Sequence, residues 1–420
     1  MAKKIISLFS GALGLDLGLE DAGLQIAVAV EKSRTAVETI KLNREANLPV
    51  IDDPIEDVSA IDILKKAGLK KREAFVLTGG PCCQTFSTAG KRKSLSDVSR
   101  GLLFRDFKRI VAETQPRFFV MENVKGMLSA AVRHRPLNER EPGFPPLAKD
   151  ELYGSALKVV CDELSELNYY VIFALVNCAD YGVAQKRHRV IFIGSRDGEE
   201  IIIPPPTHSD SNGKCPWRTL RDSIGKLRQG RPRFVRFSKD QIKFLKLLRA
   251  GQNWRDLPAH LQKTALGAAY VSWGGRSGFC RRLDWDKPSP TLTTDPGGRA
   301  TMLCHPTKLR PLTVREYARL QQFPDNWRFA GSVGQKYVQI GNAVPIGLGR
   351  AIGKMLVGVA WRTDSGLQAK HWKRRGEVAC ADPILAMRLE NRPKTDLNPP
   401  RMRKNKDRAA ARRWLQQMAA

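Results

Sequence analysis

The sequence predicts an α/β fold, with a mainly parallel, doubly wound sheet and a second, smaller domain of irregular structure. Two observations lead to this prediction. Over the first 200 residues, short apolar runs that suit strands alternate with amphipathic helical segments, and this β-α-β rhythm is typical of parallel sheets. Beyond Pro204-Pro205-Pro206 the periodicity weakens, and Arg, Trp, Gly and Pro become more frequent. A length of 420 residues leaves room for two or three domains.

The first elements follow each other closely. Ile5–Phe9 is an apolar run that predicts a strand, and Ser10–Gly14 is a turn with two glycines. Regularly spaced leucines then predict an amphipathic helix. Gln25–Val30 predicts a second strand, which ends at Glu31, and a third short apolar segment precedes Asp53.

The remaining elements follow from the same patterns. Further strands are predicted at residues 74–78, 118–121, 170–177 and 189–193, the last two as neighbours. Helices are predicted at 35–43, 103–113, 155–167, 312–320 and 346–359. From Trp361 onward the chain is rich in Arg and Lys, and we expect a disordered or loosely helical extension there.

The chain is strongly basic. Lys and Arg number 71 against 42 Asp and Glu, which gives a formal net charge of +29 spread along the sequence. This excess favours a polyanionic partner, most simply nucleic acid, over a generally basic soluble protein.

The cysteines and the first residues of the chain indicate the cellular compartment in which the protein works. Eight cysteines are scattered without a C-x-x-C pair, so we expect no metal site and a reducing cytoplasm. The apolar start contains Gly11 and Gly14 and runs into Asp16, which argues against a signal peptide. We expect no membrane span.

The most informative segment is Gly79–Ser87, Gly-Gly-Pro-Cys-Cys-Gln-Thr-Phe-Ser, which follows a predicted buried strand. Its glycines and proline force a turn, so Cys82 and Cys83 would lie at the strand's carboxyl end, where ligands gather in α/β sheets. A cysteine there is either a candidate nucleophile or a small thiol that packs the turn.

Two further segments carry candidate catalytic groups. Glu122 ends another predicted strand, and a glutamate beside a cysteine suits proton donation during covalent attack, unless it only caps a helix. Gln185, Arg187 and Arg189 lie on one face of an extended segment. These side chains could bind a carboxylate, a base edge or a phosphate. The alternative is a basic edge that only contacts solvent.

Other strand ends suit a cofactor. The Ser10–Gly14 turn lets a backbone approach a ligand closely, although it does not match the dinucleotide pattern G-x-G-x-x-G. Glu31 is placed to bind ribose hydroxyls, and Asp53 to reach an adenine or ribose. An ordinary turn and solvated acids are the alternatives.

In this order, these segments resemble the DNA (cytosine-5) methyltransferase family, and in particular prokaryotic restriction-modification enzymes. The resemblance covers about residues 4–360. Its motifs are Phe-Ser-Gly-x-x-Gly, Gly-Gly-Pro-x-Cys-Gln-x-Phe-Ser, Glu-Asn-Val, Gln-x-Arg-x-Arg, and the segments Arg315–Pro324 and Gln339–Pro345.

The resemblance implies an α/β, Rossmann-like S-adenosylmethionine-dependent methyltransferase domain at residues 1–204, completed by a return segment at 308–360. Residues 205–307 would be a smaller, irregular target-recognition domain, and residues 361–420 a basic C-terminal extension. The implied partner is double-stranded DNA, bound by a cytoplasmic monomer that works beside a cognate restriction endonuclease.

The resemblance also implies roles for single residues. Cys83 would attack C6 of a cytosine flipped out of the duplex, Glu122 would bind N3, and Arg187 and Arg189 would orient Glu122 and the base. The residues implied at the S-adenosylmethionine site are Phe9, Gly11, Ala12, Glu31, Asp53 and Asn342. Those implied at the DNA are Gln84, Ser87, Arg276, Arg281, Arg282, Lys287 and Thr291.

Two departures from the family pattern stand out. Cys82 replaces a usual proline, and Ala12-Leu13 stand where the family often has a second glycine, although we expect cofactor binding to be retained. Thr88–Lys93 is small and basic, as expected of a loop that closes over DNA. The alternative functions are an RNA cytosine-5 methyltransferase and a catalytically inactive DNA-binding regulator.

Overall fold

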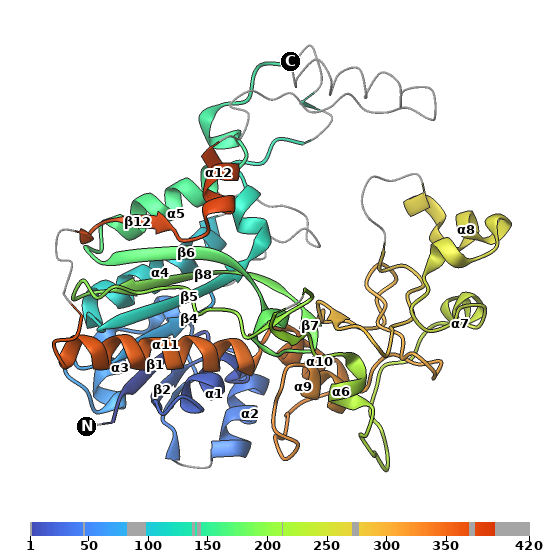
Figure 1. Ribbon diagram of the computed structural model, residues 1–420, viewed down its shortest axis with the longest axis horizontal. Coiled ribbons are helices and arrows are strands. Elements are labelled where there is room, and N and C mark those ends of the chain that lie inside the picture. Colours follow the sequence, from blue (N-terminus) through green and yellow to red (C-terminus); the bar gives the residue numbers. More distant parts are fainter. Residues whose placement is uncertain are drawn as a thin grey trace.

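The computed structural model describes residues 2–44, 47–81, 98–136, 139–140, 144–211, 213–270, 277–368 and 374–390. An eight-stranded sheet forms the centre of its larger part (Figure 1). In spatial order the strands are β12 (Val378–Cys380), β6 (Tyr170–Asn177), β8 (His188–Ser195), β5 (Phe118–Val124), β4 (Val76–Gly79), β1 (Lys4–Leu8), β2 (Gln25–Val30) and β3 (Val50–Ile51).

Neighbouring strands in this sheet are parallel except at β8, which pairs antiparallel with both β5 and β6. The predicted mainly parallel α/β sheet is therefore confirmed, as is the predicted adjacency of residues 170–177 and 189–193.

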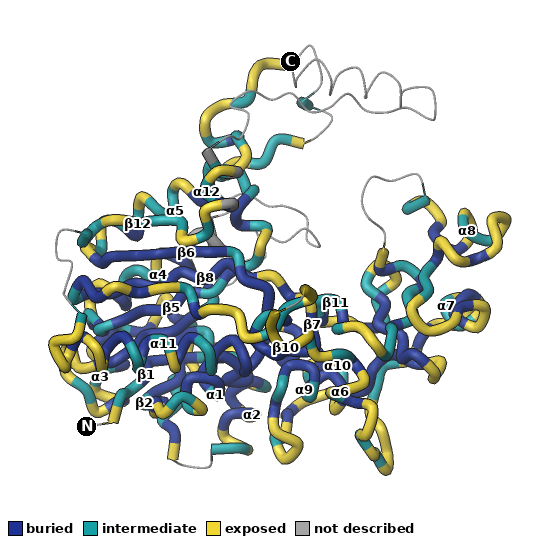
Figure 2. Tube along the Cα trace, viewed as in Figure 1, coloured by how far each residue is buried: buried dark blue, intermediate teal, exposed yellow. Residues whose placement is uncertain are grey.

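Helices cover both faces of the sheet. One face carries α1 (Gly14–Glu20), α2 (Arg34–Arg44) and α11 (Ile346–Asp364), and the other carries α3 (Ala60–Ala67), α4 (Val98–Thr114) and α5 (Ser155–Ser165). In β1, Ile6 packs in the core with Phe107 of α4, whereas Ile5 packs in the core with Ile352 of α11. Successive residues of a strand face opposite sides of the sheet, and both kinds are apolar and buried here. Both faces of the sheet are therefore covered, as in other parallel sheets (Figure 2).

The last long helix packs against the first. A Cβ added at Gly349 of α11 would lie 2.3 Å from the carbonyl oxygen of Leu15, and one added at Gly14 would lie 2.4 Å from that of Val344. Such distances leave no room for a side chain, so glycine is required for this contact. The contact brings the chain's return segment back to the turn that follows β1.

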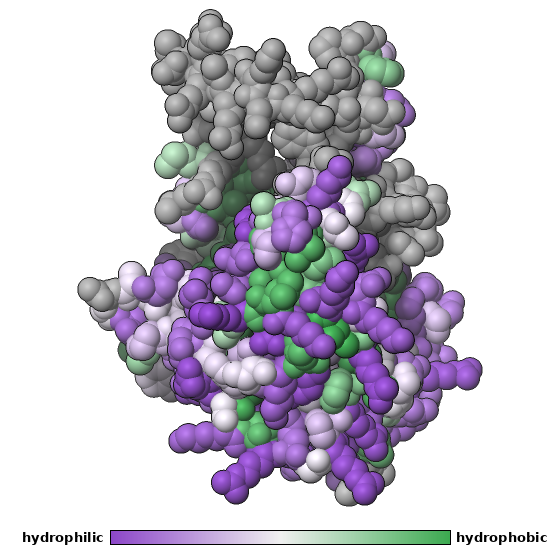
Figure 3. Space-filling view, turned by 90° about the vertical axis from the view of Figure 1, so that its right-hand side faces the viewer, coloured by the Kyte–Doolittle hydropathy of each residue, from purple (hydrophilic) through white to green (hydrophobic). Residues whose placement is uncertain are grey.

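The described residues between 205 and 307 lie beside the sheet, at the right of Figure 1, and most of them have irregular structure. This region contains α6 (Leu220–Ile224), α7 (Lys239–Leu245), α8 (Ala259–Leu266) and the short pair β9 (His208–Ser209) and β10 (Cys215–Pro216). It has its own small core of Phe237, Phe244, Leu245, Leu248, Trp254, Leu257, Ala265, Leu266, Cys280, Met302 and Cys304. Figure 3 looks onto this side of the molecule, where hydrophilic side chains surround a smaller hydrophobic area.

Shorter elements connect the two regions. β7 (Gln185–Lys186) pairs with β11 (Ser289–Pro290), and α9 (Val314–Leu320) and α10 (Val333–Asn342) precede α11. The 3-10 helices among the described residues include η2 (Ile55–Asp57), η3 (Lys125–Ser129), η5 (Lys149–Glu151), η6 (Cys178–Tyr181), η7 (Trp254–Asp256) and η8 (Gly267–Tyr270).

Over residues 361–368 and 374–390, the part of the predicted loose extension that the structure describes, the chain is folded. α11 continues to Asp364, β12 adds a parallel strand beside β6, and α12 (Pro383–Glu390) follows with Leu385 buried. The reason is local: Val378-Ala379-Cys380 is a short apolar run that fits an edge position, although the charged residues around it hide it in the sequence.

One described stretch, Val333–Asp364, is long and apolar enough by composition to cross a membrane. However, 61% of its most apolar window is buried inside the protein, as in the core helix of a globular fold.

Candidate active site

Several of the predicted site residues that the structure describes, among them Gly11, Glu31, Glu122 and Arg189, lie at one edge of the sheet. The parallel strands β1 to β5 end at this edge, and the antiparallel β8 begins there. The chain direction across the sheet reverses between β1 and β4, which are neighbours. Ligands of open α/β sheets bind outside the carboxyl ends of the strands at such a switch point.

Glu122 and Arg189 form an ion pair at this edge. Arg189 Nε contacts Glu122 Oε1, and both side chains are nearly buried. The other carboxylate oxygen, Oε2, lies 3.1 Å from where a Cβ of Gly80 would stand. The glutamate is thus fixed by its arginine and packed against the backbone that leads from β4 toward Cys83.

Several predicted residues lie outside the described part of the chain: Cys82, Cys83, Gln84, Ser87, the segment Thr88–Lys93 and Arg276. The described segment that contains β4 ends at Pro81, two residues before Cys83. The Nδ2 atom of Asn123 lies 3.5 Å from the Pro81 carbonyl oxygen, to which it donates, so this end of β4 contacts the strand that carries Glu122.

The turn after β1 contacts the carboxylate that ends β2. Gly11 has φ +53°, and its N–H donates to Glu31 Oε2 at 2.8 Å, while Glu31 Oε1 accepts from Ser33 N at 2.8 Å. A Cβ added at Gly11 would meet nothing within 4 Å, so this backbone faces open space. A turn with accessible backbone beside a carboxylate fits a nucleoside-containing cofactor.

The other predicted cofactor residues lie around this turn. Phe9 also has a positive φ of 52°, and Ala12 is buried. Asn342 is exposed at the end of α10, two residues before the Val344 that packs against Gly14. Asp53 is exposed beyond the end of β3, at the far side of the same sheet edge.

Arg187 has contacts other than those predicted. Instead of reaching Glu122, its Nη1 donates to the carbonyl oxygen of Leu292 at 3.2 Å and its Nη2 to that of Gly341 at 2.9 Å. Arg189 is therefore the arginine that contacts Glu122. The local sequence could place both arginines on one face of a strand, but not identify their distant partners.

Gln185 and Gln321 extend this buried network. Gln185 Oε1 accepts from Leu292 N at 2.8 Å, and its Nε2 donates to Gln321 Oε1 at 3.0 Å. Gln321 Nε2 donates in turn to the carbonyl oxygens of Ile340 and Ala343. Sequence reasoning missed Gln321, although its place inside the Arg315–Pro324 motif was a signal.

Asp16 was also missed as part of the site. Its buried carboxylate accepts from Ser7 Oγ and Thr78 Oγ1, both at 2.9 Å, and so connects α1 to β1 and β4. Burial raises its pKa to about 6. The only sequence signal is an acid within an otherwise apolar run, Leu15-Asp16-Leu17.

A cavity of about 650 Å³ lies between β7 and the irregular region. Arg281 and Thr291, two of the candidate DNA contacts, line it together with Lys186, His188 and Lys287. Thr291 is held by a hydrogen bond from its Oγ1 to the carbonyl oxygen of Lys186 at 2.9 Å. Arg282 does not line this cavity and donates to the carbonyl oxygen of Pro306 at 3.1 Å.

Comparison with known proteins gives a consistent result. The family model described as C-5 cytosine-specific DNA methylase matches residues 3–358. The type II methyltransferase M.Sau96I of Staphylococcus aureus is 37% identical over 360 residues, covering 84% of this chain and 75% of the relative. The type II methyltransferase M.Eco47II of Escherichia coli is 35% identical over 359 residues, covering 84% and 78%.

Solved structures show the same fold. A putative DNA modification methyltransferase encoded within an Escherichia coli prophage aligns with a TM-score of 0.58 at 24% identity, covering 86% of this chain and 99% of that one. A DNMT2 mutant of Spodoptera frugiperda aligns with a TM-score of 0.50 at 18% identity, covering 85% and 100%.

Proposed function

The chain belongs to the C-5 cytosine-specific DNA methylase family and is a DNA (cytosine-5-)-methyltransferase, and we propose that it acts through a covalent adduct between Cys83 and a flipped cytosine. The observation that carries this proposal is the Glu122–Arg189 ion pair, packed against Gly80 at the switch point of the sheet. It holds an acid beside the segment in which the candidate nucleophile stands.

The chemistry explains why a thiol and an acid are both needed. C5 of cytosine is a poor nucleophile, and addition of the Cys83 thiolate to C6 moves the C5–C6 electron pair toward C5 and N3. Glu122 binds or protonates N3 and so stabilises this adduct. After C5 has been methylated, a base removes its proton, the C6–S bond breaks, and the thiolate and the aromatic ring are restored.

S-adenosylmethionine is the proposed cofactor, and when bound it would supply an electrophilic methyl group. The Glu31 carboxylate is an acceptor for its ribose hydroxyls, and the open backbone of the turn at Gly11 and Ala12 suits the part near its methionine end. Phe9, Asp53 and Asn342 would complete the pocket, with Asp53 at the adenine and Asn342 contributed by the return segment.

The proposed substrate is a short site in duplex DNA. Residues 205–307 would recognise it, residues 1–204 and 308–360 would carry catalysis, and Gln84, Ser87 and Arg276 would contact the DNA. Flipping a base costs a few kcal/mol, which contacts in the pocket must offset. The relatives are named type II methyltransferases, so we also propose a cognate restriction endonuclease and a cytoplasmic, monomeric enzyme.

Bisulfite sequencing of DNA from a methylation-free bacterium that expresses this chain tests the function. We expect protected cytosines confined to one short motif, and none with Cys83→Ser. Soluble protein without protected cytosines would contradict the proposal and favour an RNA substrate or an inactive DNA binder.

A further inference from the structure

The cavity beside β7 has a basic wall that the methyl-transfer chemistry does not use. Its lining includes the cations Lys186, Arg281 and Lys287, and the hydroxyl groups of Thr291 and Thr301. Among the described residues that line it, none is an acid. A cavity with this lining is suited to an electron-rich, hydrogen-bond-accepting ligand.

Arg281 is held in place within this wall. Its Nε donates to the carbonyl oxygen of Met302 at 3.0 Å, and its Nη atoms have no hydrogen-bond partner among the described residues. Among the described residues, no carboxylate oxygen lies within 4.0 Å of the Arg281 guanidinium, so Arg281 forms no salt bridge with them. Burial without a compensating charge lowers the pKa of Arg281 to about 10. The free protein thus holds a partly desolvated guanidinium whose outer edge lacks acceptors, which is costly until a ligand supplies them.

Lys186 and Lys287 differ from Arg281 because their side chains are exposed. Lys186 is exposed, with its Nζ 4.4 Å from the centre of the Trp217 ring. Lys287 is also exposed and pairs with Asp284 at 3.1 Å. Exposed ammonium groups on long side chains suit phosphate contacts, which position DNA without specifying its sequence.

Arg282, the next residue, provides an internal contrast. Residues 281–283 run extended beside Cys304, since Cys304 N donates to the Arg281 carbonyl oxygen and Leu283 N donates to that of Cys304. Successive side chains of an extended segment face opposite sides. Arg282 accordingly points away from the cavity and binds the Pro306 carbonyl oxygen.

We propose that Arg281 reads a guanine of the target site, with its Nη edge donating to O6 and N7 in the major groove, while Lys186 and Lys287 contact phosphates. A fixed, planar guanidinium matches these two acceptors, which is the commonest specific contact of arginine with a base pair. This proposal rests on the proposed function, because it requires duplex DNA in the cavity.

The test compares Arg281→Lys with Arg282→Lys in the full chain, on duplexes in which each guanine of the target site is replaced in turn by 7-deazaguanine. That base pairs normally but lacks the N7 acceptor. For the wild type we expect one such guanine to lower kcat/KM about 10- to 100-fold. Arg281→Lys should lose activity on the natural site by a similar factor and be indifferent to 7-deazaguanine at that one position. Arg282→Lys should keep the wild-type pattern.

Two results would overturn the proposal. One is that no 7-deazaguanine position is sensitive in the wild type, or that Arg281→Lys keeps the wild-type sensitivity. The other is that Arg281→Lys weakens binding equally for target and unrelated duplexes, with a salt slope lowered by about 1, as for a phosphate contact. Fluorescence anisotropy separates these cases, and thermal unfolding establishes that each variant folds. Failure of the proposed function would show differently, as absence of methyl transfer in the wild type.

Discussion

Arg187 Nη2 donates to the carbonyl oxygen of Gly341 at 2.9 Å, so one buried side chain contacts the residue directly before Asn342. Its Nη1 holds Leu292, next to Thr291 in the wall of the basic cavity. The same guanidinium therefore joins the segment that leads into β8, the proposed cofactor pocket and the proposed DNA contact. We infer that it fixes the distance between these parts.

Replacing Arg187 by Met should destabilise the free protein by about 2–4 kcal/mol, because two buried carbonyl oxygens lose their donors. Lys186→Met is the matched control: it changes the neighbouring, exposed side chain and should cost less than about 1 kcal/mol. Urea unfolding followed by circular dichroism measures both. Equal losses in the two variants would show that Arg187 does not have this structural role.

Glu122→Gln should lower the rate of methyl transfer by at least about 100-fold, because an amide cannot protonate N3. Binding of the target duplex should change much less, since Arg189 and the rest of the edge remain in place. Single-turnover rates and anisotropy titrations measure the two effects separately. A variant that keeps more than a tenth of the wild-type rate would remove Glu122 from its proposed role.

Asp16 gives the fold a predictable pH dependence. Burial raises its pKa from 3.8 to about 6, so the folded protein favours the protonated form. Protonated Asp16 therefore contributes to the free energy of unfolding. This contribution is full below about pH 4, and it is lost as the pH rises through about 6. Relative to Asp16→Asn, the wild type should lose at most about 3 kcal/mol of unfolding free energy across this range.

Urea titrations at several pH values measure this difference. Asp240→Asn, at an exposed position of α7, serves as the control and should show a constant difference from the wild type. A constant difference for Asp16→Asn as well would mean that Asp16 does not titrate in this window.

The positions of Glu31, Glu122 and Arg189 were predictable because each stands at the end or start of a strand with a clear local pattern. Parallel strands then bring those ends to one edge by geometry alone. The partners of Arg187 were not predictable, because Leu292 and Gly341 are 105 and 154 residues away. The contact between Asp16 and Thr78, 62 residues apart, was unpredictable for the same reason. The strand β12 was missed because three apolar residues among charged ones show no strand periodicity.

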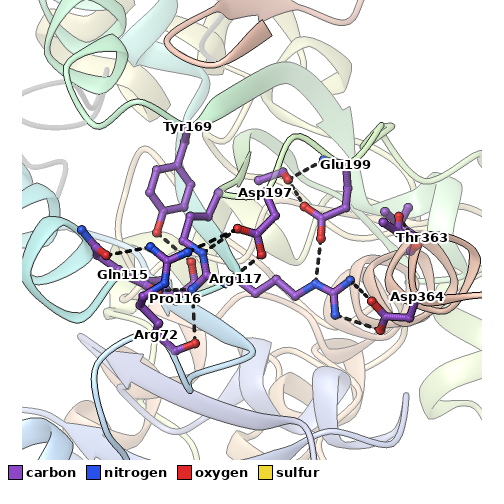
Figure 4. Close-up of polar contacts among 12 residues, drawn as sticks. Arg72, Gln115, Pro116, Arg117, Tyr169, Asp197, Glu199, Thr363 and Asp364 are labelled. Atoms are coloured by element: carbon purple, nitrogen blue, oxygen red, sulfur yellow. Dashed lines mark hydrogen bonds and ion pairs between the residues drawn. The ribbon is translucent and has the colours of Figure 1, made fainter. Parts of the chain in front are cut away.

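A second polar network, buried only at its Glu199 end, attaches the end of α11 to the opposite edge of the sheet (Figure 4). Arg117 Nε donates to Glu199 Oε1 at 2.7 Å, and its two Nη atoms donate to the carboxylate of Asp364 at 2.9 and 2.7 Å. The Glu199 side chain is fully buried, whereas that of Asp364 is 58% exposed.

The two carboxylates should therefore differ in their contribution to stability. Glu199→Ala removes the buried acceptor of Arg117 Nε, although Asp364 still binds the Nη atoms, and should cost about 1–3 kcal/mol. Asp364→Ala, at the exposed end, should cost less than about 1 kcal/mol. Urea unfolding of the two variants checks this order, and a larger loss for Asp364→Ala would reverse our assignment of the stabilising contact.

The covalent role of Cys83 is the central claim, and trapping the adduct tests it most directly. A target duplex with 5-fluorocytosine should block the last step, since the fluorine at C5 cannot leave as a proton does. With S-adenosylmethionine present, we predict a complex that survives denaturing electrophoresis for the wild type and for Cys82→Ser, and none for Cys83→Ser. A denaturation-resistant complex with Cys83→Ser, or its loss in Cys82→Ser alone, would contradict the account.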